Sequence, residues 1–401
     1  MSEFSYLEKL LDGVEVKWLP LGHIAAIKTG QSVNKNMISK NPGVYPVINS
    51  GREPLGFINT WNTDNDPIGI TTRGAGVGSV IWQEGKYFRG NLNYSITIDK
   101  KSHINIRYMY HALLHMKNDI HELCTFDGIP ALNAGSLKKL LIPIPCPNNP
   151  EKSLAIQAEI VRILDKFTAL TAELTAELTE RKKQYNYYRD QLLSFEEGEV
   201  EWKTLGEIAK IQRGASPRPI AQYMTDADDG IPWIKIGDTS PDSKYINGTA
   251  QKVTPDGAKK SRILNPGDFV ISNSMSFGRP YILSITGAIH DGWASISDFS
   301  ERLDSDYLYH YLSSQRVKNY WGSKINSGSV SNLNADIIKT LPLPLPDIQK
   351  QKWIATLLDK FDTLTSSISE GIPREIELRQ KQYEYYRDLL FSFPKSEAAS
   401  N

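Results

Sequence analysis

Closely spaced glycines mark the segment of this chain most suggestive of chemistry. Residues 68–82 read Ile-Gly-Ile-Thr-Thr-Arg-Gly-Ala-Gly-Val-Gly-Ser-Val-Ile-Trp, with glycines at positions 74, 76 and 78. A nucleotide-binding glycine loop is followed by a helix, and a Walker loop also contains a lysine. Here a β-rich Val-Ile-Trp follows and that lysine is missing. The pattern therefore favours a tight turn between two strands over a phosphate-binding loop.

The other residues with catalytic potential have no partners at a useful spacing. His111 and His310 occupy matching positions in two short predicted helices, among tyrosines and aliphatic residues, which favours core or capping histidines over ligands. The Pro-Asp pairs at 241 and 255 lack the Glu-x-Lys of a nuclease, and the Asn-Pro pairs lack the Pro-aromatic continuation of an amino-methyltransferase loop. Cys124 and Cys146 match no metal or redox spacing. We find no catalytic set and no metal site, and we predict a chain that binds and organises.

Composition and charge narrow the class of protein without naming a partner. The 401 residues favour two or three domains, and 46 Lys and Arg balance 46 Asp and Glu. Residues 14–150 carry 14 basic against 9 acidic side chains, so the electrostatic evidence on a nucleic-acid partner is neutral. No apolar run of about 18 residues occurs, and the first residues lack the pattern of a secretory signal. We therefore expect a cytoplasmic protein.

An internal repeat sets the organisation of the chain. A Trp-x-x-Leu-Gly-x-Ile entry occurs at residues 18–24 and again at 202–208, an offset of 184 positions. Each copy ends in a Pro-rich strand followed by a long helical stretch, and Gln-Tyr-x-Tyr-Tyr-Arg-Asp occurs at 184–190 and at 382–388. The framework of the two copies matches, whereas their polar loop residues differ. A repeat of this length indicates two similar domains rather than a solenoid.

The two helical stretches have apolar seams of coiled-coil type. In residues 149–195 the seam positions alternate steps of four and three, and about 40 helical residues give a rod on the order of 60 Å. The second stretch has a similar stripe, broken at Gly-Ile-Pro 371–373, where glycine ends one helix and proline opens the next. Two matched seams favour an intramolecular coiled coil over two ordinary amphipathic helices. The candidate seam residues are Phe167, Leu174, Leu178, Tyr185, Tyr188, Phe361, Tyr383 and Tyr386.

These patterns predict an α+β protein with approximate twofold symmetry within one chain. Two globular α/β heads are separated by two long antiparallel coiled-coil helices. The heads are residues 14–150 and 198–347. The helices are residues 151–197 and residues 348–401, of which the last part is a tail. Residues 1–13 repeat the end of the first long helix, so we expect this N-terminal piece to pack with the C-terminal helix.

The motifs resemble the specificity subunits (HsdS) of type I restriction–modification systems. The resemblance rests on the Trp-x-x-Leu-Gly-x-Ile entries, on Ile-Pro-Trp-Ile-Lys-Ile-Gly-Asp at 231–238, and on Ser-Gly-Ser-Val-Ser-Asn-Leu-Asn at 327–334. The Leu-Asp-Lys-Phe openings at 164 and 358 add to it. The tandem Thr-Ala-Glu-Leu at 171–178 and the two Tyr-rich blocks resemble the IC subgroup in particular. The resemblance covers the whole chain and is weakest inside the first head.

The resemblance implies that each head is a target recognition domain that reads one half of a bipartite, asymmetric DNA sequence. It also implies that two methyltransferase subunits (HsdM) dock on the helices and that restriction subunits (HsdR) join this complex. The helices would set the length of the spacer between the two half-sites. S-adenosylmethionine, ATP and Mg would then belong to those partners, which carry out DNA methylation and phage defence. This chain would be a non-catalytic subunit.

Given that implication, arginine, lysine and asparagine in the hairpin loops are the candidates for base contact. Arg or Lys pairs with guanine and Asn or Gln with adenine in the major groove, although half or more of DNA contacts go to the backbone. The candidates are Arg52, Arg73, Arg89 and Asn91 in the first head, and Arg213, Arg218, Lys235, Asn273 and Arg279 in the second.

Two alternatives stay open at this point. One is a stand-alone bipartite DNA-binding regulator that uses the long helices only as a spacer. The other is a methyltransferase or nuclease with unrecognised motifs. Co-purification with large partners distinguishes the first, and activity of the isolated chain with S-adenosylmethionine or Mg²⁺ distinguishes the second.

Overall fold

The computed structural model describes residues 10–11, 13–51, 53–196, 198–240, 243–273, 278–299, 301–326, 333–367 and 369–394. The chain forms two compact units. The first unit spans Met1–Ala172 and Leu378–Asn401, and the second spans Glu173–Glu377. Each unit therefore combines one head with parts of both long helical segments, and the divisions fall inside those segments rather than where a head meets a helix.

The first unit contains the first head and the helical segments packed on it. Its elements up to the first long helix are β1 (Val16–Pro20), α2 (Leu21–Ile24), β2 (Ala25–Thr29), α3 (Lys35–Lys40), β3 (Pro42–Ile48), β4 (Phe57–Ile58), β5 (Thr63–Asp64), β6 (Ile68–Thr71), β7 (Val80–Trp82), β8 (Lys86–Arg89), β9 (Asn93–Ile98), the 3₁₀ turn Lys100–Ser102, α4 (Ile106–His115), α5 (Lys117–Glu122), β10 (Cys124–Thr125), β11 (Ala131–Leu132), α6 (Ala134–Leu137), β12 (Leu141–Pro145) and α7 (Pro150–Leu192).

Two small sheets form the body of the first head. One has the strand order β2-β9-β6-β7 and the other β4-β3-β8-β5, in which β3 and β8 run parallel. β1 pairs separately with β12 and so closes the start of the head onto its end. The expected turn at residues 74–78 connects β6 and β7, with glycines 74 and 78 at φ +90° and +79°, where a side chain would be strained. The main core comprises Leu21, Ile68, Ile70, Ile96, Met109, Leu113, Leu137 and Ile142.

The second unit repeats this order of elements with its own loops. Its elements are β13 (Glu201–Thr204), α8 (Leu205–Ile208), β14 (Lys210–Arg213), the 3₁₀ turn Ile220–Gln222, β15 (Met224–Thr225), β16 (Ile231–Ile234), the 3₁₀ turn Ile236–Asp238, β17 (Tyr245–Ile246), β18 (Lys252–Val253), α9 (Pro255–Lys259), β19 (Arg262–Leu264), β20 (Phe269–Ser272), β21 (Pro280–Leu283), β22 (Gly287–Ile289), β23 (Trp293–Ser297), α10 (Ser305–Leu312), α11 (Gln315–Asn326), α12 (Ala335–Lys339), β24 (Pro342–Leu345), α13 (Ile348–Ser366) and α14 (Ile372–Leu390), of which α14 continues into the first unit.

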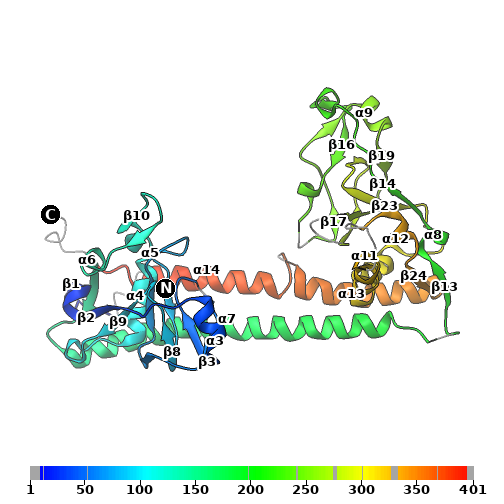
Figure 1. The fold of residues 1–401 in the computed structure, drawn as a ribbon. Helices are drawn as coiled ribbons and strands as arrows, with labels where there is room; N and C mark the ends of the chain where they lie inside the picture. The colour runs from blue at the N-terminus through cyan, green and yellow to red at the C-terminus, as the bar shows by residue number, and fades with distance from the viewer. Residues whose placement is uncertain are drawn as a thin grey trace. The chain divides into compact units, whose positions relative to one another are not determined.

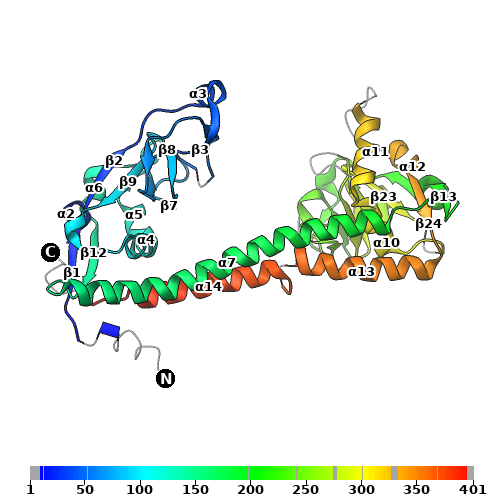
Figure 2. The same cartoon turned by 90° about the horizontal axis from the view of Figure 1, so that it is seen from below.

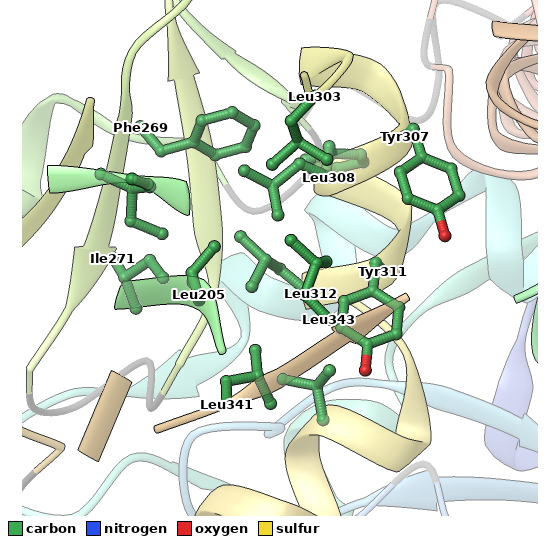
Figure 3. Packing of buried hydrophobic residues seen from close by; sticks show 14 of the residues in the cluster. Leu205, Phe269, Ile271, Leu303, Tyr307, Leu308, Tyr311, Leu312, Leu341 and Leu343 are labelled. Carbon is green, nitrogen blue, oxygen red and sulfur yellow. The ribbon is translucent and has the colours of Figure 1, made fainter. Parts of the chain in front are cut away.

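Again two sheets and a closing strand pair build the head. The sheets have the orders β14-β23-β20-β21-β17 and β15-β18-β16-β22-β19, and β13 pairs with β24 as β1 does with β12. The core lies between the first of these sheets and α10. Figure 3 shows Phe269 and Ile271 of β20 facing Leu308 and Leu312 of α10, with Leu343 of β24 beside them.

Helix α7 begins at Pro150, with Glu151 in its first turn, and extends over 43 residues. Proline is favoured in a first helical turn and a carboxylate there interacts well with the helix dipole. The seam positions Leu174 and Leu178 are half-buried between exposed neighbours, as the heptad pattern predicts. Beyond Tyr185, Arg189 is also buried, over the Tyr185 ring, and Tyr188 is 45% exposed.

Within each unit, α7 packs against a part of the C-terminal segment. In the first unit, Phe167 of α7 stacks on Tyr386 of α14, with ring centroids 5.2 Å apart. In the second unit, Tyr188 of α7 stacks on Phe361 of α13 at 5.6 Å. Figures 1 and 2 show α14 beside the start of α7 in the first unit, and α13 beside the end of α7 in the second. Each head is therefore seated on a pair of helices.

The C-terminal segment is interrupted at the predicted place. α13 ends at Ser366 and α14 begins at Ile372, so the Gly-Ile-Pro sequence lies where one helix gives way to the next. Of the N-terminal piece, Leu11 lies in an apolar cluster with Leu390, Phe391 and Phe393 at the end of α14. Residues 1–9 and 12 of that piece lie outside the described residues.

Candidate nucleic-acid interface

In the second head, the candidate residues gather where strands of both sheets end. Arg213 is the last residue of β14, Asn273 follows β20 and Arg279 precedes β21. β14 and β20 both run antiparallel to β23, so these three positions lie beside the start of β23 at Trp293. Lys235 follows β16, and the indole N–H of Trp293 donates to the carbonyl oxygen just before Lys235 at 3.2 Å. We name these positions, with Arg218 and Asp291, the second edge.

Asp291 orients two of the cations at the second edge, one through its carboxylate and one through its backbone carbonyl. Asp291 accepts hydrogen bonds from the Ser216 hydroxyl at 3.0 Å and from the Arg218 guanidinium at 3.3 Å. Its backbone carbonyl accepts from Arg213 Nε at 3.2 Å. Burial alone would raise the pKa of Asp291, but these hydrogen bonds and nearby positive charges hold that pKa below its usual value. Arg218 remains 83 % exposed and Arg213 is exposed, so both guanidinium groups are accessible from solvent.

The other three candidates of the second head are half-buried and held by neighbours. Lys235 Nζ donates to Gln251 Oε1 at 2.6 Å. The Arg279 guanidinium lies over the Tyr281 ring, 5.3 Å from its centroid. The backbone N–H of Asn273 donates to the carbonyl of Gly292 at 3.1 Å, which ties the end of β20 to the loop that carries Asp291. The five predicted residues thus come from different loops but share one edge of the head.

The first head has a corresponding edge. Arg73 lies two residues after β6 and Asn91 lies in the turn between β8 and β9; both side chains are exposed. Because Thr71 at the end of β6 pairs with Asn93 at the start of β9, the two loops are neighbours. We name this the first edge. Arg52 lies outside the described residues.

Arg89 occupies a different environment from the other candidates. Its side chain is only 4 % exposed, and its guanidinium donates to Asn93 Oδ1 at 2.5 Å, to the Asp66 carbonyl at 2.7 Å and to the Tyr87 hydroxyl. Burial lowers its pKa, opposed by interactions with Tyr87 and Asp66. A guanidinium held in this way ties strands together, and we assign Arg89 a structural role in place of base contact.

Each head is fixed to its helices by a buried histidine. The sequence predicts core or capping histidines at these positions but does not indicate their partners. In the first unit, His111 of α4 is fully buried. Its Nε2 lies 2.8 Å from Asp165 Oδ1 on α7, and its Nδ1 lies 2.9 Å from the Tyr383 hydroxyl on α14. A neutral imidazole that donates from Nε2 and accepts at Nδ1 satisfies both contacts. Arg107 also pairs with Asp165, at 2.5 Å.

The electrostatics of this first joint follow from its burial. Burial lowers the pKa of His111, against the opposing effect of Asp165. For Asp165, burial alone would raise the pKa, but hydrogen bonds from Arg107 and His111 hold that pKa below its usual value. The stable state is therefore a neutral imidazole next to an ionised carboxylate.

The second unit contains the same joint, with the helices exchanged. His310 of α10 lies 2.8 Å from Asp359 Oδ1 on α13 and 3.0 Å from the Tyr185 hydroxyl on α7. The cation differs, because Lys244 from the head pairs with Asp359 at 2.7 Å and with Asp306 at 2.6 Å. The Leu-Asp-Lys-Phe and Tyr-rich repeats thus supply the carboxylate and the phenol of both joints. α7 gives its aspartate to one head and its tyrosine to the other.

A second contact, common to both units, reinforces the joint. Gln157 of α7 accepts a hydrogen bond from the Asn105 backbone at 2.8 Å, just before α4. Gln351 of α13 accepts one from the Asp304 backbone at 2.9 Å, just before α10. Both glutamines are buried, so each anchors the start of the helix that carries the joint histidine.

Comparison with known proteins identifies the family. The model for the type I restriction modification DNA specificity domain matches residues 13–181 and 197–378. The chain belongs to this family. It is 42% identical to the EcoR124I/EcoR124II specificity subunit of Escherichia coli over all of both chains, and 33% identical to the EcoprrI specificity subunit of Escherichia coli over 92% of this chain and 93% of that one. It is therefore a specificity subunit, the non-catalytic DNA-recognition component of a restriction–modification complex.

Solved structures agree on the fold. A type I restriction–modification S subunit from M. genitalium superimposes with a TM-score of 0.57 at 18% identity, covering 96% of this chain and 98% of that one. A structure from work on complex assembly and conformational transition of a type I system superimposes with a TM-score of 0.56 at 15% identity, covering 94% and 97%. Two heads joined by long helices are thus the fold of these proteins.

Among the described residues, no helix is both long enough and apolar enough to cross a bilayer. In the same part of the chain, no group of three or more His, Cys, Asp or Glu side chains is arranged to hold a metal ion.

Proposed function

We propose that each head reads one half of a bipartite, asymmetric DNA sequence, and that it does so with the edge defined above. The observation that carries the proposal is the convergence of cationic and amide side chains from separate loops on one strand-end edge in each head. Both edges use the same framework but different residues. Such an arrangement suits two heads that share a fold and read different bases.

The chemistry of the second edge supports base contact by Arg213 and Arg218. Both are exposed, and Asp291 limits their conformations without burying them. A guanidinium that is already oriented loses less entropy when it forks onto a guanine. Lys235 and Arg279 are half-buried and suited to phosphate or base contact. In the first edge we propose Arg73 and Asn91. Arg52 lies outside the described residues and stays a candidate from the sequence.

We propose that the long helices dock two methyltransferase subunits (HsdM), that these are joined by restriction subunits (HsdR), and that the helices set the spacer between half-sites. S-adenosylmethionine, ATP and Mg would bind to those partners. Membership of the IC subgroup stays a prediction. The stand-alone regulator is not favoured, because the relatives at 42% and 33% identity are specificity subunits of restriction enzymes.

Substitutions at one edge test the proposal. In the complex with the methyltransferase, Arg213→Ala with Arg218→Ala should relax or abolish recognition of one half-site and leave the other intact. Lys210→Ala is a matched control, because it removes a positive charge from the same strand, β14. Lys210 starts this strand and Arg213 ends it, so the two residues lie about 10 Å apart along the strand. Sequencing of methylated sites reads both halves at once. Equal loss in both half-sites, or an equal effect of the control, would overturn the proposal.

A further inference from the structure

A hairpin beside the first edge carries exposed apolar side chains. β10 and β11 pair antiparallel, and the tip between them reads Phe-Asp-Gly-Ile-Pro at residues 126–130. Phe126 is 50% exposed and Ile129 is 67% exposed. The Phe126 ring lies against His121, with centroids 4.7 Å apart, which limits its rotation. Figure 1 shows the β10 hairpin projecting from the body of the first head.

The hairpin is joined to the loop that carries Arg73. The N–H of Leu132 donates to the Thr72 carbonyl at 2.8 Å, and the N–H of Gly74 donates to the Pro130 carbonyl at 3.0 Å. A bridge also pairs Arg73 with Ala131. The backbone on both sides of Arg73 is therefore hydrogen-bonded to the second strand of the hairpin. A molecule that contacts the Arg73 side chain comes within reach of the hairpin tip.

The composition of the hairpin limits what its tip can bind. Residues 124–132 contain no lysine or arginine, and their one charged side chain is Asp127. Such a tip does not attract phosphates. In a DNA groove, apolar side chains contact the thymine methyl group, and a carboxylate can accept from cytosine N4. The chemistry therefore fits base edges rather than the DNA backbone.

We propose that Phe126 and Ile129 contact thymine methyl groups in the half-site read by the first head. The inference rests on the proposed function of the first edge. Leu-Asn at 132–133 aligns with Leu-Asn at 333–334, which aligns Phe126 with Ser327 and Ile129 with Val330. The aromatic side chain is therefore particular to the first head, whereas an aliphatic residue is common to both copies. These two side chains add an apolar component to the recognition by Arg73 and Asn91.

Duplexes in which single thymines are replaced by deoxyuridine test the proposal. Deoxyuridine keeps the base pair and lacks only the methyl group. With the complex of wild-type chain and methyltransferase, we expect about fourfold weaker binding for each contacted thymine replaced, within one half-site only. Phe126→Ser and Ile129→Ser should abolish this sensitivity. Val44→Ser is the control variant, because Val44 is also exposed, at 79%, but lies near the start of β3. A complex that carries Val44→Ser should keep the wild-type sensitivity to deoxyuridine.

The outcomes separate this inference from the proposed function. If the wild-type complex binds its bipartite site but shows no deoxyuridine effect in that half-site, or if the variants retain the effect, the inference is wrong and the proposed function stands. If the two variants weaken assembly with the methyltransferase in the absence of DNA, the hairpin is a protein contact and the inference is also wrong. If the wild-type complex has no sequence preference, the proposed function itself fails.

Discussion

Replacing Asp165 by alanine should loosen the first head from its helices without disturbing the second. Asp165 is the carboxylate of the first joint and receives hydrogen bonds from His111 at 2.8 Å and from Arg107 at 2.5 Å. Without it, the Nε2–H of a fully buried imidazole has no acceptor in this structure. The joint of the second unit uses Asp359 instead, so it remains complete.

The expected loss of stability in Asp165→Ala follows from the burial of its two partners, His111 and Arg107. A buried donor left without a partner costs about 1–3 kcal/mol. The Arg107 pair contributes about 0–1 kcal/mol, because the Asp165 side chain is 37% exposed and the pair is screened by solvent. Together these give about 1–4 kcal/mol in the free energy of opening of α4. That difference corresponds to about 5- to 700-fold faster exchange of the α4 amides.

Hydrogen exchange followed by mass spectrometry measures this effect separately for each head. Peptides from Ile106–His115 should exchange faster in Asp165→Ala, whereas peptides from Ser305–Leu312 should keep their wild-type rates. Glu180→Ala is the control, because it breaks only the exposed ion pair with Lys183 on the same helix. It should change the free energy of opening of α4 and of α10 by less than about 0.5 kcal/mol. Unchanged exchange in α4, or an equal rise in both heads, would refute the role assigned to the joint.

A double-mutant cycle then isolates the contact. His111→Leu removes the other partner, and replacing both partners of a buried hydrogen bond is less costly than removing one. The combined variant should therefore be more stable than the sum of the single effects predicts, by about 1–2 kcal/mol. Strict additivity would show that the two side chains do not act on each other.

Three further predictions concern pH, single bases and the spacer. Burial lowers the pKa of His111, so its contribution to stability is complete above the unfolded value of about 6.5 and is lost as the pH falls through the folded value; the depressed pKa of Asp165 acts in the same direction at lower pH. The protection factors of the α4 amides, which are corrected for the intrinsic pH dependence of exchange, should accordingly fall on acidification below about pH 6.5. Protection factors that stay constant with pH would contradict this. If the Arg279 side chain forks onto a guanine, Arg279→Ala should cost about 1–3 kcal/mol of binding free energy and relax specificity at one base position. If it contacts a phosphate, the substitution should weaken binding to all sequences alike and reduce the salt dependence of binding. Binding to mismatched duplexes at two salt concentrations distinguishes the two. A third Thr-Ala-Glu-Leu block after residue 178 should lengthen the spacer by one or two base pairs, since four helical residues add about 6 Å, and identical spacers in methylation maps would show that the block does not set the distance.

Elements with strong local signals were predictable from the sequence. The start of α7 follows from Pro150 with an acidic first turn, and the interruption between α13 and α14 follows from the Gly-Ile-Pro sequence. The half-buried positions of Leu174 and Leu178 follow from the heptad spacing. These features depend on residues close together in the chain, which is why a pattern can reveal them.

Individual polar contacts between distant parts of the chain were not predictable. Arg89 looked like a loop residue beside Asn91, but it ends a strand flanked by β3 and β5, and three of the four residues of that strand are buried. The partners of His111 lie 54 and 272 positions away, so no local pattern could connect them. The repeat itself held the missing signal, because each joint reuses a motif that occurs twice, and only the structure shows which copy serves which head.

Exchange of the whole first head tests most directly the claim that the two heads read separate half-sites. Residues 14–150 would be replaced by the corresponding head of another specificity subunit, with the joint residues His111 and Arg107 retained so that Asp165 and Tyr383 keep their partners. The methylated sites of cells carrying the hybrid complex would then be sequenced. We expect one half of the target to change to that of the donor, with the other half and the spacer unchanged. A hybrid that alters both halves, or one that assembles and methylates the original target, would contradict independent reading by the two heads.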